Sequence, residues 1–316
     1  MGTIKTTVRP SISSTWTSFK RMVLHRRKLT ALICVLVVLI TLYTVKNQHI
    51  TSFSDHADKP VLYILTATYQ RNVQRAELTR ICNTLHNLKE ILWILVEDSV
   101  QPTRVVANIL DNCGVPFVHL NIPTPHSEKP KLNEPYWFRP KGIHQRNLGL
   151  QWLRQNLMLG KNKGVLYIAD DDNSYDLRIF EEMRGTSRVS TWPVGFAGEL
   201  PWEGCVTSTN GTYITRMWSV YKPERPFPID MAGFAVNVDL ILKNPNAGFD
   251  YKRPRGMQES QFLLDLGIKH WRELEPLADG CQKILVWHTR TAEPVLTLWN
   301  KLESQGVMPP PISDWP

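Results

Sequence analysis

The sequence predicts an α/β protein with a mainly parallel, Rossmann-like sheet, followed by a half of mixed or antiparallel sheet. After residue 60, short apolar runs alternate with helical patterns, which is typical of parallel strands joined by helices. Three aspartates, Asp170 to Asp172, follow one of these apolar runs. Beyond Ser190 the pattern changes to short strand-like pieces with Trp, Pro and Gly. No G-x-G-x-x-G fingerprint follows the first strand, so a dinucleotide is not indicated.

The N-terminal residues predict a membrane anchor. Residues 29–45 carry no charge and are rich in Leu, Val and Ile, a run just long enough to cross a bilayer as a helix. Residues 1–28 contain seven Lys and Arg and no acidic residue, so the positive-inside tendency keeps them in the cytoplasm. A cleaved signal peptide would have a shorter basic region and a cleavage site of small residues. We therefore expect a cytoplasmic tail at 1–28, a type II signal anchor at 29–45 and a stem at 46–59.

The net charge of +8 does not indicate a nucleic-acid-binding protein. The seven basic residues of the tail account for +7 of this charge and leave +1 on the rest of the chain. Because the basic excess lies in the tail and not on the folded part, no nucleic-acid partner is expected.

The folded region is expected to span residues 60–302 and to divide after residue 173 into a parallel half and a mixed half. In the first half the patterns predict strands at 61–65, 92–96, 116–120 and 165–168, and helices at about 74–87 and 142–157. In the second half they predict strand-like pieces at 191–196, 213–221 and 234–238. Three prolines and few apolar residues predict an irregular tail at 303–316.

Four of the five cysteines lie beyond the anchor, on the side expected to face an oxidising lumen: Cys82, Cys113, Cys205 and Cys281. They are compatible with two disulfides in any of three connectivities, and equally with free thiols in a core. The only N-x-[ST] acceptor is Asn210, in a polar stretch typical of an exposed turn. It agrees with a protein of the secretory pathway.

The aspartates Asp170–Asp172 stand where the apolar run 165–168 ends. Ligands of α/β sheets bind beyond the carboxyl ends of the strands, and crowded carboxylates repel one another unless a cation is present. Carboxylate oxygens suit hard ions such as Mn²⁺ or Mg²⁺, which complete their shell with water and substrate phosphates. The alternative is a helix start, in which Asp172 or Asn173 caps the segment 175–183.

Three further segments carry candidate site residues, each with an ordinary structural alternative. His288 and Arg290 end an apolar strand and could hold a diphosphate, or could form a solvated strand end. Glu259 could be a general base, or a glutamate that the helix dipole favours in a first turn. The proline-stiffened loop 221–234 offers aromatic faces with Arg225 and Asp230 for a sugar, or is a plain connection into a strand.

Together these segments resemble the β1,3-glucuronyltransferase family, inverting Golgi enzymes that transfer glucuronic acid from UDP-glucuronic acid to galactose. The resemblance runs from about residue 60 to residue 294. Its specific stretches are Ala-Asp-Asp-Asp-Asn at 169–173, Arg-Pro-Phe-Pro-Ile-Asp-Met-Ala-Gly-Phe-Ala at 225–235 and Val-Trp-His-Thr-Arg-Thr at 286–291.

The resemblance implies a GT-A type nucleotide-sugar fold, with a donor-binding half at 60–173, an acceptor-binding half at 174–302 and Mn²⁺ held at Asp170–Asp172, chiefly through Asp172. Glu259 falls at the family's catalytic base. The donor-binding residues that it implies are Thr66, Thr68, Tyr69, Asp98, Lys141, Arg146, Asp170, Asp171, His288 and Arg290. The acceptor-binding residues are Glu203, Tyr221, Arg225 and Asp230.

Two positions depart from the family pattern. Lys141 stands where an arginine of the donor site is expected, and a lysine cannot make the same planar two-point contact with a carboxylate. Tyr221 stands where a tryptophan often forms the stacking surface for the acceptor. These departures bear on donor affinity and on the identity of the acceptor.

The resulting hypothesis is a manganese-dependent transferase that moves glucuronic acid from UDP-glucuronate onto the 3-hydroxyl of a terminal galactose, with inversion. The acceptor is the Gal-β1,3-Gal end of a proteoglycan linkage or, alternatively, the Gal-β1,4-GlcNAc end of a glycoprotein. A xylosyl transferase and a silent glycan-binding protein on the same scaffold are the rivals. The resemblance also implies a Golgi membrane location and a homodimer.

Overall fold

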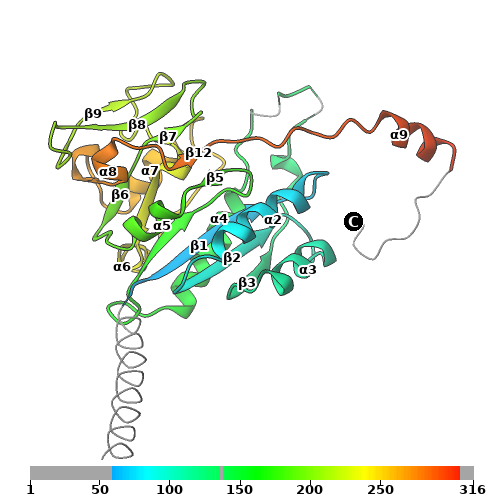
Figure 1. Ribbon diagram of the computed structural model, residues 1–316, viewed down its shortest axis with the longest axis horizontal. Coiled ribbons are helices and arrows are strands. Elements are labelled where there is room, and N and C mark those ends of the chain that lie inside the picture. Colours follow the sequence, from blue (N-terminus) through cyan, green and yellow to red (C-terminus); the bar gives the residue numbers. More distant parts are fainter. Residues whose placement is uncertain (1–58, 132, 136–137, 307–316) are drawn as a thin grey trace, which may run out of the picture. The chain divides into compact units, whose positions relative to one another are not determined.

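The computed structural model describes residues 59–131, 133–135 and 138–306, which build a large mixed sheet and a smaller one (Figure 1). The larger sheet has seven strands in the order β11–β6–β10–β4–β1–β2–β3. Their bounds are β1 Val61–Thr68, β2 Ile91–Glu97, β3 Phe117–Asn121, β4 Gly164–Ile168, β6 Val189–Thr191, β10 Phe234–Asn237 and β11 Glu275–Pro276.

Strands β1 to β4 form the parallel part of this sheet, with β1 between β2 and β4. Their connecting helices are α2 (Gln74–Leu85), α3 (Arg104–Cys113) and α4 (Ile143–Asn156). The chain runs outward from β1 to β3 and then returns to the other side of β1. The carboxyl ends of β1 and β4 therefore flank a topological switch point, where open α/β sheets bind ligands. The α/β class and the parallel first half are confirmed.

The second half of the chain contributes to both sheets. Strand β10 pairs antiparallel with β4, so that β6, β10 and β11 extend the parallel sheet rather than lying only beside it. The smaller sheet has the order β5–β12–β7–β8–β9. Its strands are β5 Ser174–Tyr175, β7 Val194–Gly195, β8 Trp202–Thr207, β9 Ile214–Trp218 and β12 Val286–Trp287.

Two predicted element boundaries are wrong. The single strand expected at 191–196 is two strands, β6 and β7, in different sheets; the chain passes between them at Pro193, which has no N–H for a strand ladder. The irregular tail expected from residue 303 begins later, because α9 (Thr297–Ser304) includes Glu303.

Two apolar clusters lie on the two faces of the large sheet. Leu62 and Ile64 of β1 belong to the cluster that includes α2, α3 and α5 (Leu177–Met183). Their neighbours Tyr63 and Leu65 belong to the cluster that includes α4, α6 (Val238–Lys243) and α7 (Gln258–Asp265). Alternate side chains of one strand point to opposite faces, so β1 holds both clusters together.

Gly149 lets helix α4 approach β1 closely. A β-carbon at this position would collide with the Leu65 side chain, so the helix can lie this near the sheet only with glycine there. Arg146 lies one turn earlier on the same helix. The close packing of α4 therefore positions this arginine at the carboxyl end of the sheet.

Two disulfides join distant elements, which decides between the disulfide and free-thiol alternatives. Cys82 of α2 pairs with Cys113 at the end of α3, and Cys205 of β8 pairs with Cys281. Cys281 ends the short α8 (Ala278–Cys281), in which all four residues have left-handed backbone angles.

No helix among the described residues is both long and apolar enough to cross a membrane. The expected anchor at 29–45, the tail at 1–28 and all of the stem except Lys59 lie outside these residues.

Candidate active site

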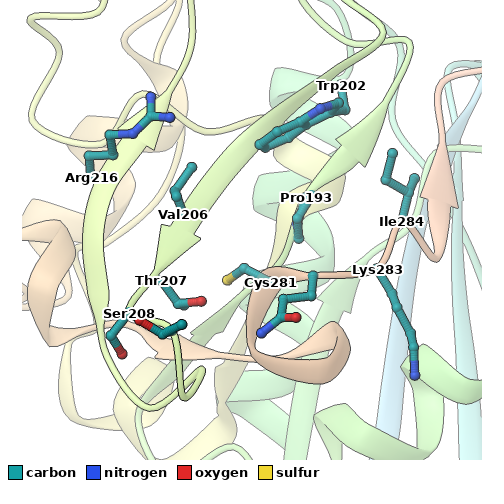
Figure 2. Close-up of a pocket in the computed structure, with 11 residues that line it drawn as sticks. Pro193, Trp202, Val206, Thr207, Ser208, Arg216, Cys281, Lys283 and Ile284 are labelled. Carbon is teal, nitrogen blue, oxygen red and sulfur yellow. The ribbon is translucent and has the colours of Figure 1, made fainter.

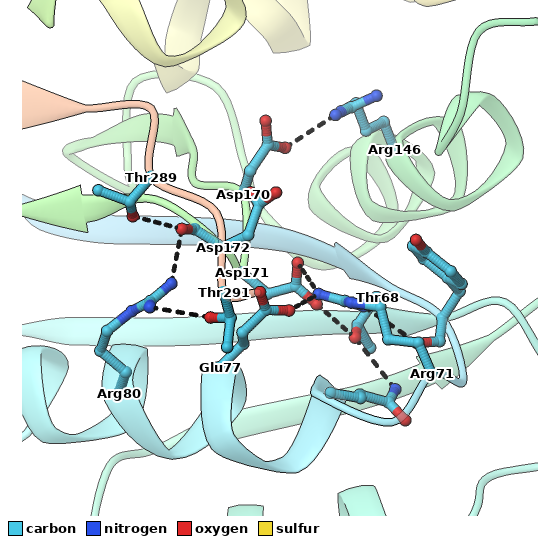
Figure 3. A network of polar contacts seen from close by, with 12 residues as sticks. Thr68, Arg71, Glu77, Arg80, Arg146, Asp170, Asp171, Asp172, Thr289 and Thr291 are labelled. Atoms are coloured by element: carbon cyan, nitrogen blue, oxygen red, sulfur yellow. Dashed lines mark hydrogen bonds and ion pairs between the residues drawn. The ribbon is translucent and has the colours of Figure 1, made fainter. Parts of the chain in front are cut away.

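The aspartates follow β4 and lie at the switch point, and they do not cap a helix. The N-cap of α5 is Asp176, whose carboxylate accepts a hydrogen bond from the backbone N–H of Arg178 at 2.9 Å. The helix-start alternative for Asp172 is therefore wrong. Asp170 Oδ1 accepts a hydrogen bond from Arg146 Nη2 at 2.9 Å (Figure 3).

Asp171 is buried and both of its oxygens are engaged. Thr68, the last residue of β1, donates to Oδ2 at 2.6 Å, and Arg71 Nη2 lies 2.7 Å from Oδ1. Burial raises the pKa of Asp171, and the charge of Arg71 opposes this rise. Arg71 also pairs with Glu77 of α2. Sequence reasoning missed Arg71, because one arginine in a loop after a strand has no distinguishing pattern.

Asp172 differs from its two neighbours, because no described residue donates a hydrogen bond to its carboxylate. Burial raises its pKa to about 6, and the nearby charges of Asp170 and Asp171 add to this rise. A half-buried carboxylate in a negative field is the environment that a cation stabilises. The carboxylate oxygens thus fit a hard divalent ion, and Asp172 is the aspartate whose carboxylate has no donor among the described residues.

A cage of three or more protein ligands is not present among the described residues. An Mn²⁺ at Asp172 would need oxygens from water and from the phosphates of a substrate, which is usual for ions in phosphate-transfer sites. The structure therefore favours Asp172 over an equal contribution from all three aspartates.

Arg146 is held at the N-terminus of α4 by the backbone around Gly142. Gly142 is the N-cap, with φ of 74°, and a β-carbon there would lie 2.9 Å from the Arg146 guanidinium. Arg146 Nη1 donates to the Lys141 carbonyl at 2.7 Å, while its Nε is buried with no partner among the described residues. The guanidinium is thus fixed beside Asp170 and retains hydrogen-bonding capacity for a ligand.

Tyr69 offers an open aromatic face at this edge of the sheet. Its side chain is 42% exposed, with the Arg71 guanidinium 4.6 Å and the Lys141 ammonium 5.3 Å from the ring centroid. An exposed ring between two cations suits a flat, negatively charged ligand such as a nucleotide. Lys141 and Tyr69, both expected donor residues, therefore lie side by side.

Two other expected donor residues are engaged within the protein. Thr66 is fully buried, and its hydroxyl accepts a hydrogen bond from Trp93 Nε1 at 3.0 Å. Its side chain is thus enclosed in the core. Asp98 accepts hydrogen bonds from the N–H and the hydroxyl of Thr124, both at 2.6 Å. It holds the loop after β3 against the end of β2.

His288 pairs with a residue expected at the acceptor side. Its Nε2 lies 2.9 Å from Asp230 Oδ1. Burial would lower the pKa of His288, but the charge and hydrogen bond of Asp230 outweigh it and raise the pKa to about 9. Asp170 and Asp172 contribute to the same rise. His288 is therefore cationic at neutral pH and lies between the aspartates and the loop 225–234. Arg290 is exposed.

Glu259 lies in the first turn of α7 with its carboxylate half-buried. Burial raises its pKa to about 7, the nearby Asp230 charge adds to the rise, and Arg225 and Arg146 oppose it. A carboxylate with a pKa near the working pH is suited to general base catalysis. Glu259 therefore feels the charges of one expected donor residue, Arg146, and of two expected acceptor residues, Arg225 and Asp230.

Three of the expected acceptor residues, Glu203, Tyr221 and Arg225, form a connected group. Ser219 donates to Glu203 Oε2 at 3.0 Å and accepts a hydrogen bond from Arg225 Nη2 at 3.4 Å. The Arg225 guanidinium lies 5.6 Å from the centroid of the Tyr221 ring. Gly256, with φ of 79°, precedes α7 and leaves room for this ring. The loop and the start of α7 therefore meet, which the spacing of 34 residues between Arg225 and Glu259 could not reveal.

Asn210 is exposed in the turn between β8 and β9. Its Oδ1 accepts a hydrogen bond from the Thr212 hydroxyl at 2.8 Å. A cavity of about 510 Å³ lies near this turn, against Trp202, Val206 and the chain around Cys281 (Figure 2). None of the described residues that line it is an expected site residue, so this cavity does not mark the reaction centre.

Comparison with known proteins gives a family match and several relatives. The family model described as Glycosyltransferase family 43 matches residues 81–292. The galactosylgalactosylxylosylprotein 3-beta-glucuronosyltransferase sqv-8 of Caenorhabditis elegans is 48% identical over 238 residues, which are 75% of this chain and 66% of that protein. Galactosylgalactosylxylosylprotein 3-beta-glucuronosyltransferase 3 of Mus musculus is 43% identical over 78% of this chain and 75% of its own length.

A third relative, galactosylgalactosylxylosylprotein 3-beta-glucuronosyltransferase 1 of Homo sapiens, is 45% identical over 75% of this chain and 71% of its own length. Among solved structures, the crystal structure of S. aureus TarS 1-349 aligns with a TM-score of 0.45 at 12% identity, over 72% of this chain and 60% of that chain.

Proposed function

Because the chain belongs to glycosyltransferase family 43, we propose that it transfers glucuronic acid from UDP-glucuronate to the 3-hydroxyl of a terminal galactose, with inversion. The relatives are named as 3-beta-glucuronosyltransferases that act on a galactosylgalactosylxylosyl protein. The observation that carries the proposal is Glu259, whose pKa is raised to about 7 beside Arg225 and Asp230. A base of this kind removes the proton of a sugar hydroxyl.

In the proposed reaction, the Glu259 carboxylate accepts the proton of the galactose 3-hydroxyl. The oxygen attacks the anomeric carbon of glucuronate from the face opposite UDP, and one displacement turns the α-linked donor into a β-linked product. Arg225, Asp230 and Glu203 supply polar atoms for the acceptor hydroxyls, and Tyr221 supplies a ring face. Holding the hydroxyl beside a fixed base is the main contribution of these residues.

The donor is assigned to the carboxyl ends of β1 and β4 in a GT-A type arrangement. Tyr69 would offer its exposed ring to the uridine, and Asp98, which holds the loop after β3, would lie on the uridine side of the site. Arg146, Lys141, His288 and Arg290 supply positive charge for the diphosphate and the uronate. Asp172 would hold Mn²⁺, which supplies a Lewis acid for the charge that develops on the departing diphosphate.

The test is an assay of purified protein with labelled UDP-glucuronate, with and without Mn²⁺. Galβ1,3-Gal and Galβ1,4-GlcNAc serve as acceptors, and UDP-xylose serves as a second donor. We expect transfer to Galβ1,3-Gal, because the relatives are named for a galactosylgalactosylxylosyl protein. Transfer only to Galβ1,4-GlcNAc would change the acceptor, preference for UDP-xylose would change the donor, and no transfer to either acceptor would favour the silent glycan-binding alternative.

We propose a type II orientation in the Golgi membrane, with the catalytic region in the lumen. It follows from the expected anchor at 29–45, and two disulfides are usual for an oxidising compartment. In this orientation Asn210 receives one N-linked glycan. Asn210→Gln is then expected to remove one glycan from the protein made in animal cells, measured by intact mass before and after glycosidase treatment. An unchanged mass would contradict the luminal orientation.

We also propose that the protein is a homodimer. Apolar side chains near the C-terminus are exposed: Val295 is 90% exposed, and Leu298 and Leu302 of α9 are 79% and 43% exposed. The two leucines are four residues apart and so share one helix face, which a second copy would cover. We expect Leu298→Glu with Leu302→Glu to convert dimers to monomers in sedimentation, while an exposed control, Lys301→Glu, should not. A monomeric wild-type protein would contradict the proposal.

A further inference from the structure

Helix α2 presents a row of polar side chains beneath the aspartates. Gln74, Glu77 and Arg80 are spaced by three residues and so follow one side of the helix. Gln74 reaches Asp171 through the Thr68 hydroxyl. Glu77 reaches it through Arg71, as Figure 3 shows. Arg80 instead contacts the backbone of Asp172. The row therefore supports the two aspartates by different means.

Arg80 bridges two segments that are far apart in the sequence. Its Nη2 donates to the carbonyl of Asp172 at 2.5 Å, and its Nη1 donates to the Thr291 hydroxyl at 3.3 Å. The Thr289 hydroxyl donates to the same Asp172 carbonyl at 2.7 Å. These two donors occupy both lone pairs of this carbonyl oxygen. The chain after β12 is therefore attached to Asp172 at two points, directly through Thr289 and indirectly through Thr291 and Arg80 (Figure 3).

We propose that Arg80 is a positioning residue that clamps the backbone of Asp172 and the segment 288–291 together. The inference rests on the proposed function, in which Asp172 holds Mn²⁺. With the Asp172 carbonyl held by two donors, the peptide that follows Asp172 is restrained, and so is the backbone from which its carboxylate projects. Thr289 lies between His288 and Arg290 in the sequence. The same clamp therefore sets how far these two cationic side chains, expected at the diphosphate, lie from Asp172.

The chemistry of the clamp requires an arginine. Its guanidinium donates in two directions at fixed angles, to a carbonyl and to a hydroxyl of different segments. A lysine at position 80 could donate to the carbonyl but could not hold both partners in one plane. The Arg80 Nε is buried with no partner among the described residues, so its burial adds an energetic cost that the two remaining contacts offset.

The experiment measures Mn²⁺ binding to the metal-free full-length protein by calorimetry, with and without UDP. Residues that orient a metal ligand typically contribute about 10- to 100-fold to metal affinity. We expect Arg80→Ala to weaken Mn²⁺ binding by about 10-fold or more, and Arg80→Lys to restore only part of it. Thr289→Val, which removes the second donor, should weaken binding too, and the double variant should lose less than the product of the two single effects.

The matched control is Arg154→Ala. Arg154 also donates to backbone carbonyls, those of Asn244 and Ala247, and its Nε is also buried without a described partner. It should lower the urea midpoint as Arg80→Ala does, but leave Mn²⁺ affinity unchanged. If Arg80→Ala and Thr289→Val lower stability yet bind Mn²⁺ like the wild type, the clamp is purely structural and the proposal is wrong. If the wild type itself takes up no Mn²⁺, the metal site fails first, and the clamp fails with it.

Discussion

Glu259→Gln is expected to lower kcat by about 10²- to 10⁴-fold, the usual cost of losing a positioned general base. Glutamine keeps the shape of the side chain but cannot accept the proton of the acceptor hydroxyl. KM for the acceptor should change little, because Arg225 and Asp230 remain. Steady-state transfer of labelled glucuronate to the disaccharide acceptor measures both constants.

A matched control is Glu224→Gln, the same change at an exposed position of the loop 221–234. It should leave turnover near that of the wild type. Near-normal turnover by Glu259→Gln would remove the assignment of the base.

The pH profile provides a second readout for Glu259. Burial raises its pKa to about 7, so below this pH the carboxyl group is protonated and cannot act as a base. We expect the rate of the wild type to increase with pH up to about 7 and then level, until His288 loses its proton near its pKa of about 9. The residual activity of Glu259→Gln should lack the acidic limb. A limb that survives this substitution would belong to another group.

Asp172→Ala is expected to abolish Mn²⁺ uptake and to reduce transfer to the background rate. Of the three aspartates, Asp172 is the one whose carboxylate accepts no hydrogen bond from a described residue, and the substitution removes it. Calorimetric titration of Mn²⁺ and the transfer assay test both effects. Asp111→Ala, at an exposed position of α3, is the control and should alter neither. Retention of both metal uptake and transfer by Asp172→Ala would contradict the whole mechanism.

Unfolding of the Asp172→Ala protein would not explain its loss of Mn²⁺ uptake and transfer, because the substitution should not destabilise the metal-free fold. The pKa of Asp172 is raised to about 6, so its carboxyl group binds a proton more tightly in the folded chain than in the unfolded chain. Above this pH the ionised carboxylate therefore destabilises the metal-free fold. At pH 7 Asp172→Ala should have a Tm at or above that of the wild type when no metal is present.

Much of the fold was predictable because its signals are local. The alternation of apolar runs and helical patterns indicated β1, β2, β3 and β4 with the helices α2 and α4, but it did not indicate α3. The end of the apolar run at 165–168 indicated Asp172. The boundary between β6 and β7 was missed, because an apolar run does not tell which sheet each residue joins. Only pairing with β10 and β8 decides this.

For the site, the sequence predicts residues but not the contacts between them. His288 was expected at the diphosphate, and the structure pairs it with Asp230, 58 residues earlier. Arg71 and Arg80 were not identified, because their partners Asp171 and Asp172 are far away in the sequence. No periodicity or motif connects such residues.

By itself the sequence determined the α/β class, the parallel first half and the residue types that can hold a metal and accept a proton. The tertiary structure alone decided that Thr68 and Arg71 engage the carboxylate of Asp171, whereas no described residue donates a hydrogen bond to the carboxylate of Asp172. It also decided that burial, rather than a local neighbour, raises the pKa of Glu259. The physical reason is that helix and strand patterns depend on neighbouring residues, whereas desolvation and ion pairing depend on the register of strands and the packing of helices.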